Sequence, residues 1–588
     1  MKKRMIFNSR PSLLLAMAIG LFTVSLQGCR SKDDVQGIAG GTTLVVRVNG
    51  VNDHTAGVKG VRASLKRGSS GSGTHVLAER KIYEGEGFDV VASIEAAVPV
   101  HRRGDSVAAV AKGGTKAAVP PEVLQSQPMA SGVQYRLLIY NASDVNHTAP
   151  VVNQVASSGT NLGLMLDAGK TYQWYAVTVN STTEVPTITS GVVSGADSKG
   201  KDLMLAQGTV TTVVGENSLG INFDRMTAQF QLTVDNRGMS GEIQNPAAIV
   251  SLLSAGDAPV LKYGDFDIFT SSYSNVNSYS LADVPAPTKG RLMLNYTLYT
   301  ADTSTVVPAG GLRLKTAGLQ IKKLDYFYRP YDATVTFPAK DLVFNNVAFT
   351  PQRGGVYKIS YELAESGVKV NGKIWARTNA VYLNDPTLKD SLMGFAPLVD
   401  KGPFINGRGY YTPVYHLGPL NLGAPLHNPA AGEDPCALVY PQGIWRLPTQ
   451  AEFEALLPLS STKTTEFMTA TNETGIFGIE YALDAGETAL SYYPQRSQQL
   501  FFPLWGKWTR PGGTQKRIVN GGCHVSVTSN NVTDISGYYW FRNPDGSTGQ
   551  FHIKTSYVNR AIGAWTVNTR PDSGDPNTNY TVRCVRAL

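Results

Sequence analysis

The chain has 588 residues, of which 42% are hydrophobic and 17% charged, and its formal net charge is +8. One hydrophobic core cannot organise a chain of this length, so we expect about two to four domains. Part of the positive charge lies within the first 28 residues. The rest is spread along the chain without a basic block interleaved with aromatics, so nucleic-acid binding has no support.

The first 28 residues have the three parts of a secretory signal. Basic residues at positions 2–4 precede an apolar run over residues 13–26, and Gly28 comes directly before Cys29. The run is shorter than the about 20 residues that a membrane-spanning helix needs. We therefore interpret residues 26–29 as a lipobox, with Cys29 as the lipidation site that anchors the mature protein to a membrane.

Alternation of apolar and polar residues predicts strands along the chain. The pattern is clearest at residues 226–235, and it also appears at residues 44–48 and 88–94. Residues 135–140 are apolar at positions that face both ways, as in a buried central strand. Residues 171–179 form a further, aromatic-rich strand. Polar turns between these strands and little helical periodicity indicate antiparallel β-sandwiches.

Two connectors separate the early strands. Residues 68–73 are Gly and Ser, and residues 98–131 are rich in Ala, Gly and Pro around the pair Arg102 and Arg103. A dibasic pair in such a segment is open to a trypsin-like protease, because cleavage requires the backbone to extend into the enzyme. The plain alternative is two solvated arginines in a loop.

The character of the chain changes near residue 373, where long Gly-, Pro- and Asn-rich stretches begin. One helix is predicted there: residues 449–452 form a capping box, residues 453–457 carry an apolar face, and Pro458 ends it. A mixed α+β domain is therefore expected from about residue 373 onward.

No catalytic or metal-binding motif is present in the sequence. His524 follows Cys523, but adjacent strand residues point to opposite faces, which favours a packed Cys beside an exposed His. We therefore expect no enzyme activity, no cofactor and no metal site. With Cys29 acylated, Cys436, Cys523 and Cys584 remain, which in an exported protein allows one disulfide and leaves one thiol.

Four segments together resemble the fimbrillin-like proteins of Bacteroides and Porphyromonas, the subunits of type V pili. They are QYRLLIYN at residues 134–141, LDAGKTYQWYA at residues 166–176, DLM at residues 202–204 and FDRM at residues 223–226. The resemblance covers about residues 40–370 and implies two transthyretin-like β-sandwich domains.

The resemblance also implies a route of assembly. In that family a lipoprotein precursor reaches the outer membrane, an arginine-specific protease removes an N-terminal strand, and a strand from a neighbouring subunit fills the groove. Applied to this chain, the released strand is residues 88–94 and the cut follows Arg102 or Arg103. Arg67 and Arg47 are alternatives, and Arg47 is the weaker because it lies inside a strand pattern.

The C-terminal part resembles the Fibrobacter succinogenes major paralogous domain, which is related to C-type-lectin-like and formylglycine-generating folds. The similarity is carried by WARTN at residues 375–379, IWRLPT at residues 444–449, GYYW at residues 537–540 and VRCVR at residues 582–586. It implies a disulfide between Cys436 and Cys584, which would stabilise the domain by a few kcal/mol. Neither the reactive cysteine arrangement of the formylglycine enzymes nor a calcium-type sugar site is found.

The predicted fold is mainly β, with two β-sandwiches followed by an α+β C-type-lectin-like domain. The expected divisions are a signal peptide at residues 1–28, a propeptide at 29–103, an N-terminal sandwich at 104–220, a second sandwich at 221–372 and the lectin-like domain at 373–588.

The functional hypothesis is an accessory subunit of cell-surface fimbriae that contributes to adhesion. Because Cys584 lies close to the end of the sequence, inside a folded domain, we expect the subunit to accept a donor strand without giving one, which places it at the tip. The alternative is a non-polymerising surface lipoprotein that binds glycan or protein. The expected partners are other subunits, the outer membrane through Cys29, and host protein or glycan.

An exposed aromatic cluster in the C-terminal domain is the candidate binding surface for such a ligand. Burial in the core is the alternative for most of its members. The candidates are Trp505, Trp508, Tyr539, Trp540 and Trp565.

Overall fold

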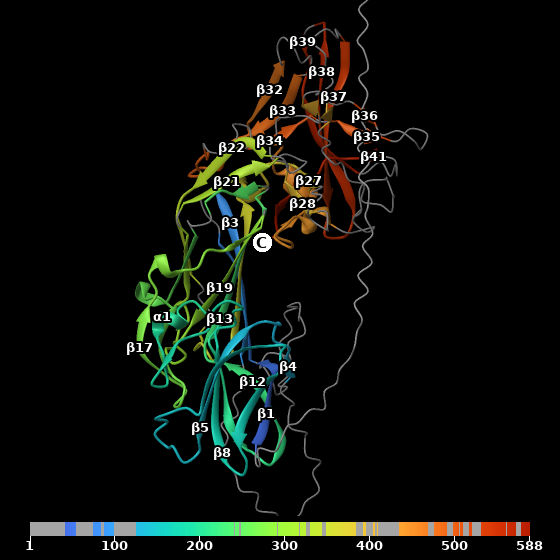
Figure 1. Cartoon of the computed structure of the whole chain (residues 1–588). Coiled ribbons are helices and arrows are strands. Elements are labelled where there is room, and N and C mark those ends of the chain that lie inside the picture. The colour runs from blue at the N-terminus through green and yellow to red at the C-terminus, as the bar shows by residue number, and fades with distance from the viewer. Residues whose placement is uncertain are drawn as a thin grey trace, which may run out of the picture.

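The fold is mainly β, as predicted: two β-sandwiches and a C-terminal block follow one another along the molecule (Figure 1). The computed structural model describes residues 41–53, 75–83, 87–98, 125–239, 241–245, 249–290, 292–316, 318–324, 330–343, 348–383, 392–395, 404–405, 408–409, 434–467, 475–490, 498–504, 506–509, 517–519, 531–559, 561–571 and 578–587.

The N-terminal sandwich is an eight-stranded sheet with the strand order β4-β1-β12-β11-β8-β5-β6, in which β7 also pairs with β1. Residues from both halves of this sheet, such as Leu44, Trp174 and Phe223, share one buried core. The sheet therefore encloses its own hydrophobic layer. Its strands are β1 Gly41–Asp53, β4 Gln125–Gln127, β5 Gln134–Asn141, β6 Val152–Ser157, β7 Leu162–Asp167, β8 Thr171–Thr178, β11 Met204–Thr211 and β12 Gly215–Arg225.

Strand β5 is buried on both faces, which confirms the prediction for residues 135–140. Its inward side chains, including Tyr135 and Leu137, enter the core of the N-terminal sandwich. Its outward side chains Leu138 and Tyr140 pack in a second cluster that includes Phe266 from the region after β12. This cluster joins the two sandwiches.

A small sheet lies at the junction between the sandwiches and has the strand order β17-β16-β10-β9. Strands β9 and β10 precede β11 in the chain, whereas β16 and β17 come from the second sandwich region, so the sheet ties the two parts together. Its elements are β9 Ile188–Thr189, β10 Val192–Val193, the short helix α1 Gly195–Ser198, β16 Lys262–Asp267 and β17 Ser272–Ser278.

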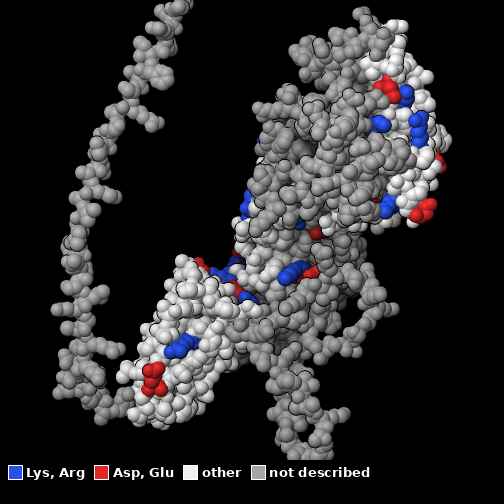
Figure 2. Space-filling view, turned by 90° about the vertical axis from the view of Figure 1, so that its right-hand side faces the viewer, with Lys and Arg blue, Asp and Glu red and all other residues white. Residues whose placement is uncertain are grey.

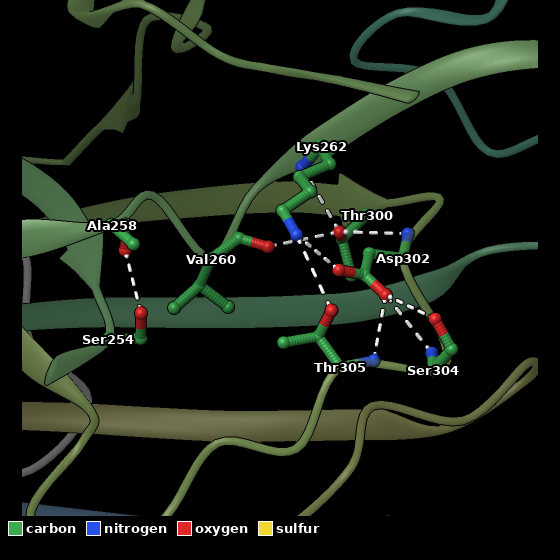
Figure 3. A network of polar contacts seen from close by, with 8 residues as sticks. All are labelled: Ser254, Ala258, Val260, Lys262, Thr300, Asp302, Ser304 and Thr305. Atoms are coloured by element: carbon green, nitrogen blue, oxygen red, sulfur yellow. Dashed lines mark hydrogen bonds and ion pairs between the residues drawn. The ribbon is translucent and has the colours of Figure 1, made fainter. Parts of the chain in front are cut away.

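A polar network fixes β16 to the second sandwich (Figure 3). The Lys262 ammonium lies 2.5 Å from an Asp302 carboxylate oxygen and 3.5 Å from the Thr305 hydroxyl. The backbone N–H groups of Ser304 and Thr305 donate to the other oxygen of Asp302 at 3.0 and 2.9 Å. Although burial alone would raise the pKa of Asp302, these donors hold it well below its usual range. Asp302 therefore stays ionised and holds Lys262 in place.

The second sandwich packs a six-stranded sheet, β18-β19-β13-β24-β3-β2, against the two three-stranded sheets β14-β21-β22 and β15-β20-β23. Side chains such as Phe230, Tyr357 and Phe337 fill the space between them. The predicted alternation at residues 226–235 is confirmed, because Ala228, Phe230, Leu232 and Val234 are all buried there. The strands are β2 His75–Tyr83, β3 Phe88–Val98, β13 Ala228–Gly238, β14 Gly241–Ile243, β15 Ile249–Leu253, β18 Thr288–Lys289, β19 Met293–Thr300, β20 Arg313–Thr316, β21 Leu319–Leu324, β22 Pro330–Phe337, β23 Lys340–Val343 and β24 Val356–Glu365, with 3-10 turns at Ala255–Asp257 and Leu281–Asp283.

The C-terminal block contains several small sheets around two hydrophobic clusters. Its helices are α2 Gln450–Glu454 and the 3-10 helix η4 Pro435–Leu438. Its strands are β25 Val368–Val370, β26 Lys373–Trp375, β27 Ala380–Leu383, β28 Leu392–Phe395, β29 Phe404–Ile405, β30 Arg408–Gly409, β31 Trp445–Arg446, β32 Ser461–Phe467, β33 Gly475–Tyr481, β34 Leu500–Pro503, β35 Lys507–Thr509, β36 Arg517–Val519, β37 Asn531–Arg542, β38 Thr548–Val558, β39 Ala561–Ile562, β40 Thr566–Pro571, β41 Thr578–Asn579 and β42 Val585–Arg586.

Helix α2 begins with the predicted capping box, in which the Thr449 hydroxyl accepts from the Glu452 N–H and the Glu452 carboxylate accepts from the Thr449 N–H. Phe453 and Leu456 are buried in the core of the block. Leu457, which was expected on the same apolar face, is 40% exposed, because the regular helix has already ended at Glu454.

The described strands on the N-terminal side of the predicted boundary at residue 103 are divided between the two sandwiches. Strand β1 belongs to the sheet of the N-terminal sandwich, whereas β2 and β3 belong to the main sheet of the second sandwich. Alternation identified residues 88–94 as a strand, but it carried no information about the partner strand.

Candidate functional site

The first candidate site is the groove that β1 fills in the N-terminal sandwich. On one edge β1 pairs in parallel with β12, from Thr42 opposite Gly215 to Val51 opposite Phe223. On the other edge it pairs antiparallel with β7 and, at its end, with β4. Both edges of β1 are thus hydrogen-bonded, and its loss would expose the backbone groups of β12 and β7.

Side chains from one face of β1 occupy the core of the N-terminal sandwich. Leu44 and Val46 are fully buried, and Val51 is 7% exposed. Two polar contacts fix the ends of the strand: the Thr42 hydroxyl donates to the Val213 carbonyl at 3.1 Å, and the Asn52 amide donates to Asp224 at 2.8 Å. Burial of the three apolar side chains stabilises the sandwich by about 6 kcal/mol.

The second candidate is β3, the strand predicted for release. It pairs antiparallel with β24 on one edge and with β2 on the other. Its inward residues Phe88, Val90, Ala92 and Ile94 are all fully buried in the core of the second sandwich. The Phe88 ring meets Phe337 edge-on at 5.0 Å. Like β1, β3 completes the core of its sandwich.

Most residues of the predicted lipidation and processing sites lie outside the described residues: Cys29, Arg67, Arg102 and Arg103. Arg47 is among the described residues. It lies in β1, opposite Gly220 of β12, and its side chain is exposed. Because β1 is paired on both edges there, its backbone cannot extend into a protease without leaving the sheet. The structure therefore disfavours Arg47.

Cys436 and Cys584 are joined by a disulfide with an S–S length of 2.05 Å and a Cα–Cα distance of 5.7 Å. Both residues are fully buried. The bond links η4 to the residue just before β42, across 148 positions of sequence. Cys523 lies outside the described residues.

The predicted exposed aromatic cluster is corrected by the structure. Tyr539 is fully buried and Trp540 is 1% exposed, because opposite faces of β37 pack into the two clusters of the C-terminal block. Trp565 is partly buried against the first of these clusters. Trp508 lies in β35, and Trp505 lies outside the described residues. Tyr539 and Trp540 therefore cannot form part of a surface binding site.

A buried arginine beside the disulfide holds the last strands of the block together. The Arg583 guanidinium donates to the Asn379 side chain at 2.9 Å and to the carbonyls of Ala376, Arg377 and Phe501 at 2.9, 2.8 and 2.7 Å. Burial lowers its pKa to about 10, so it remains charged at neutral pH. These bonds join three separate segments, and sequence patterns alone did not identify them.

A cavity of about 530 Å³ opens between the second sandwich and the C-terminal block. Charged groups of both signs line it: Asp89 of β3, Lys369, Arg377 and Glu487. Among the described residues that line it, none is aromatic.

On the face shown in Figure 2, acidic and basic side chains lie in small separate patches among uncharged residues. Within the described parts of the chain, no group of three or more His, Cys, Asp or Glu side chains is placed to hold a metal ion. No helix in those parts is long and apolar enough to span a membrane.

Comparison with protein-family models matches residues 143–375 to the family described as fimbrillin-like. The matched segment begins just after β5 and ends at the last residue of β26. No curated protein matches the chain at a significant level.

Solved structures that match the chain include the fimbrial anchor protein Mfa2 from Porphyromonas gingivalis, at 14% identity over 33% of this chain and 73% of that chain, with a TM-score of 0.20. They also include a fimbrial assembly protein from Parabacteroides distasonis, at 11% identity over 40% of this chain and 87% of that chain, with a TM-score of 0.21. The family match over residues 143–375 supports a subunit related to fimbriae or adhesion.

Proposed function

We propose that this protein is an accessory subunit of cell-surface fimbriae that accepts a strand from a neighbouring subunit in the place occupied by β1. The observation that carries the proposal is β1 itself, the first described strand, which is paired on both edges and places Leu44 and Val46 in the core. Removing it leaves unpaired edges on β12 and β7 and empties the pockets of Leu44, Val46 and Val51. A strand with the same alternation restores both.

The groove defines the chemistry of its donor. Apolar side chains are required at positions equivalent to Leu44 and Val46, and the pairing register with β12 shifts between Val48 and Gly50 before Val51 enters the core. Residues facing outward, such as Arg47, are unconstrained because they are exposed. The expected donor is an extended segment with alternating β-branched or aliphatic residues.

Proteolysis at an arginine would vacate this groove. A cut after Arg102 or Arg103 removes β1, β2 and β3 together, whereas a cut after Arg67 removes β1 alone. Both cuts free the N-terminal sandwich to accept a donor. Before processing, the lipid on Cys29 holds the precursor at the outer membrane.

We place the subunit at the fimbrial tip. Support comes from the segment around Arg583 and β42, which is held by the disulfide of Cys584 and by the four hydrogen bonds of Arg583. These contacts oppose the departure of β42 from its sheet to pair with another subunit. The C-terminal block, for which we retain the C-type-lectin-like assignment, is then presented outward and contributes to adhesion.

A non-polymerising surface lipoprotein is the second candidate, because the mixed-charge cavity beside Asp89 could hold a small polar ligand. In that case β1 stays in its groove and no processing occurs.

Electron microscopy of sheared fibres labelled with antibody against the C-terminal block separates these readings. We expect label at one end of each fibre for the natural protein. No label is expected for a variant with Arg67, Arg102 and Arg103 replaced by Ala, and full label for Arg570→Ala, an exposed arginine far from the N-terminal segment. Label along the fibre shaft would refute the tip position, and fibres without label would refute the fimbrial role.

A further inference from the structure

Strand β3 has a second buried face, which β1 lacks. Its inward residues fill the second sandwich, but Asp89 and Val91 point the other way and are 3% and 1% exposed. Val91 belongs to a cluster that also contains Trp445, Val582 and Cys584 of the C-terminal block. The outer face of β3 therefore lies against that block.

A buried ion pair crosses this interface. The Arg586 guanidinium of β42 binds the Asp89 carboxylate, and the two side chains are only 3% and 4% exposed. The same guanidinium lies 4.0 Å from the centroid of the Trp445 ring. A buried charge that loses its partner is strongly destabilising, so the position of β42 depends on the carboxylate that β3 supplies.

The neighbouring strands of the same sheet extend the interface. The Tyr440 hydroxyl contacts Asp235 of β13 at 2.6 Å and Glu362 of β24 at 3.0 Å, and the Arg237 guanidinium lies 4.1 Å from the Tyr440 ring centroid. Gly238, at the end of β13, permits this approach, because a Cβ there would lie 2.9 Å from the Tyr440 carbonyl. Three adjacent strands thus hold the C-terminal block, and β3 supplies the ion pair.

Strand β1 has no such role. The core that it enters contains residues of the N-terminal sandwich, and its outward residue Arg47 is exposed. In Figure 1, β1 lies beside β12 at the end of the molecule opposite β37 and β38, while β3 runs through the middle. Replacing β1 by a donor strand leaves the C-terminal block in place. Replacing β3 would instead remove the Asp89 carboxylate that binds Arg586.

We infer that the outer face of β3 docks the C-terminal block on the second sandwich, and that β3 therefore stays in the mature subunit while β1 is the strand that is replaced. The second half of this inference rests on the proposed fimbrial function. It restricts processing to a cut between the end of β1 and the start of β2, and argues against one after Arg102 or Arg103.

The docking is tested on the purified, unprocessed protein by hydrogen exchange with mass spectrometry. For Asp89→Asn we expect exchange at residues 434–447 and 578–587 to accelerate by roughly 10-fold or more. Ser93→Ala, on the same face of β3 but half-buried, serves as the matched control and is expected to leave exchange there unchanged. Unchanged exchange in Asp89→Asn would overturn the docking role.

A double variant separates docking from general loss of folding. Asp89→Leu with Arg586→Met removes both buried charges together, so we expect exchange at residues 578–587 within about threefold of the natural protein. If the double variant exchanges as fast as Asp89→Asn, then removing the Arg586 charge does not relieve the effect of losing the Asp89 charge. That result would overturn the inference.

The retained strand is tested on protein from sheared fibres by mapping its peptides. We expect peptides covering residues 88–98 in the same chain as the C-terminal block, and none from residues 41–53. Chains that begin at Gly104 would overturn the inference while leaving the fimbrial function intact. Absence of the protein from fibres would instead refute the proposed function and with it the claim about β1, and the exchange experiment alone would then decide the docking.

Discussion

Replacing Leu44 by Ala in the unprocessed protein is expected to loosen β1 from the N-terminal sandwich. The Leu44 side chain is fully buried among residues that include Ile221 and Phe223. Removing it leaves a cavity in a packed core, and such substitutions destabilise by about 3 kcal/mol. Because about 1.4 kcal/mol corresponds to a factor of ten, the amides of β12 that pair with β1 should exchange with solvent ~100-fold faster.

The matched control is Arg47→Ala, three residues further along the same strand and exposed. Its cost should stay below about 0.5 kcal/mol, which is roughly a twofold change in exchange. Hydrogen exchange with mass spectrometry, read on peptides covering residues 215–225, measures both variants. Equal exchange in Leu44→Ala and Arg47→Ala would refute the reasoning that Leu44 anchors β1 in the groove.

Three further predictions concern the C-terminal block. Burial, followed by the charge of Arg570, lowers the pKa of His552 to about 4, and its ring lies 4.6 Å from that of Tyr538. The neutral ring is favoured in the folded state, so its contribution is complete above about pH 6.5. As the pH falls toward 4, up to about 2 kcal/mol is lost once solvent screening is allowed for, and denaturant titrations of His552→Gln should show a smaller loss over that range. Replacing Cys436 and Cys584 together by Ala should lower the stability of the block by about 4 kcal/mol, measured by calorimetry, and an unchanged midpoint would contradict this. Thr449→Ala removes the cap of α2 and should cost about 1 kcal/mol by denaturant titration, whereas no change would mean that the capping box is not required.

Local patterns in the sequence predicted much of the fold. Alternation identified β13 and β3, in which every second residue is apolar and enters the core of the second sandwich, and β5 was identified by the apolar character of a strand that is covered on both faces. The capping box located α2 because its hydrogen bonds join residues three positions apart. These features depend on neighbours in the chain, so the sequence alone contains them.

Apart from the disulfide of Cys436 and Cys584, which the resemblance implied, contacts between distant segments were not predicted. Asp89 and Arg586 are separated by 497 positions, and nothing near Asp89 marks it as the partner of an arginine. The partner of β3, strand β24, lies more than 250 residues away, so alternation could not assign β3 to the second sandwich. The choice between exposure and burial for Tyr539 and Trp540 of β37 could not be made from the sequence for the same reason, because burial of both faces follows from packing between distant segments.

The central claim is that β1 leaves its groove when the protein enters a fibre. The most direct test is the mature N-terminus of the protein, determined by mass spectrometry in the sheared fibre fraction and in the outer membrane. The account predicts fibre-derived chains that lack residues 41–53, together with a membrane precursor acylated at Cys29. Fibre-derived chains that retain residues 41–53, or acylated protein in the membrane with none in fibres, would contradict it.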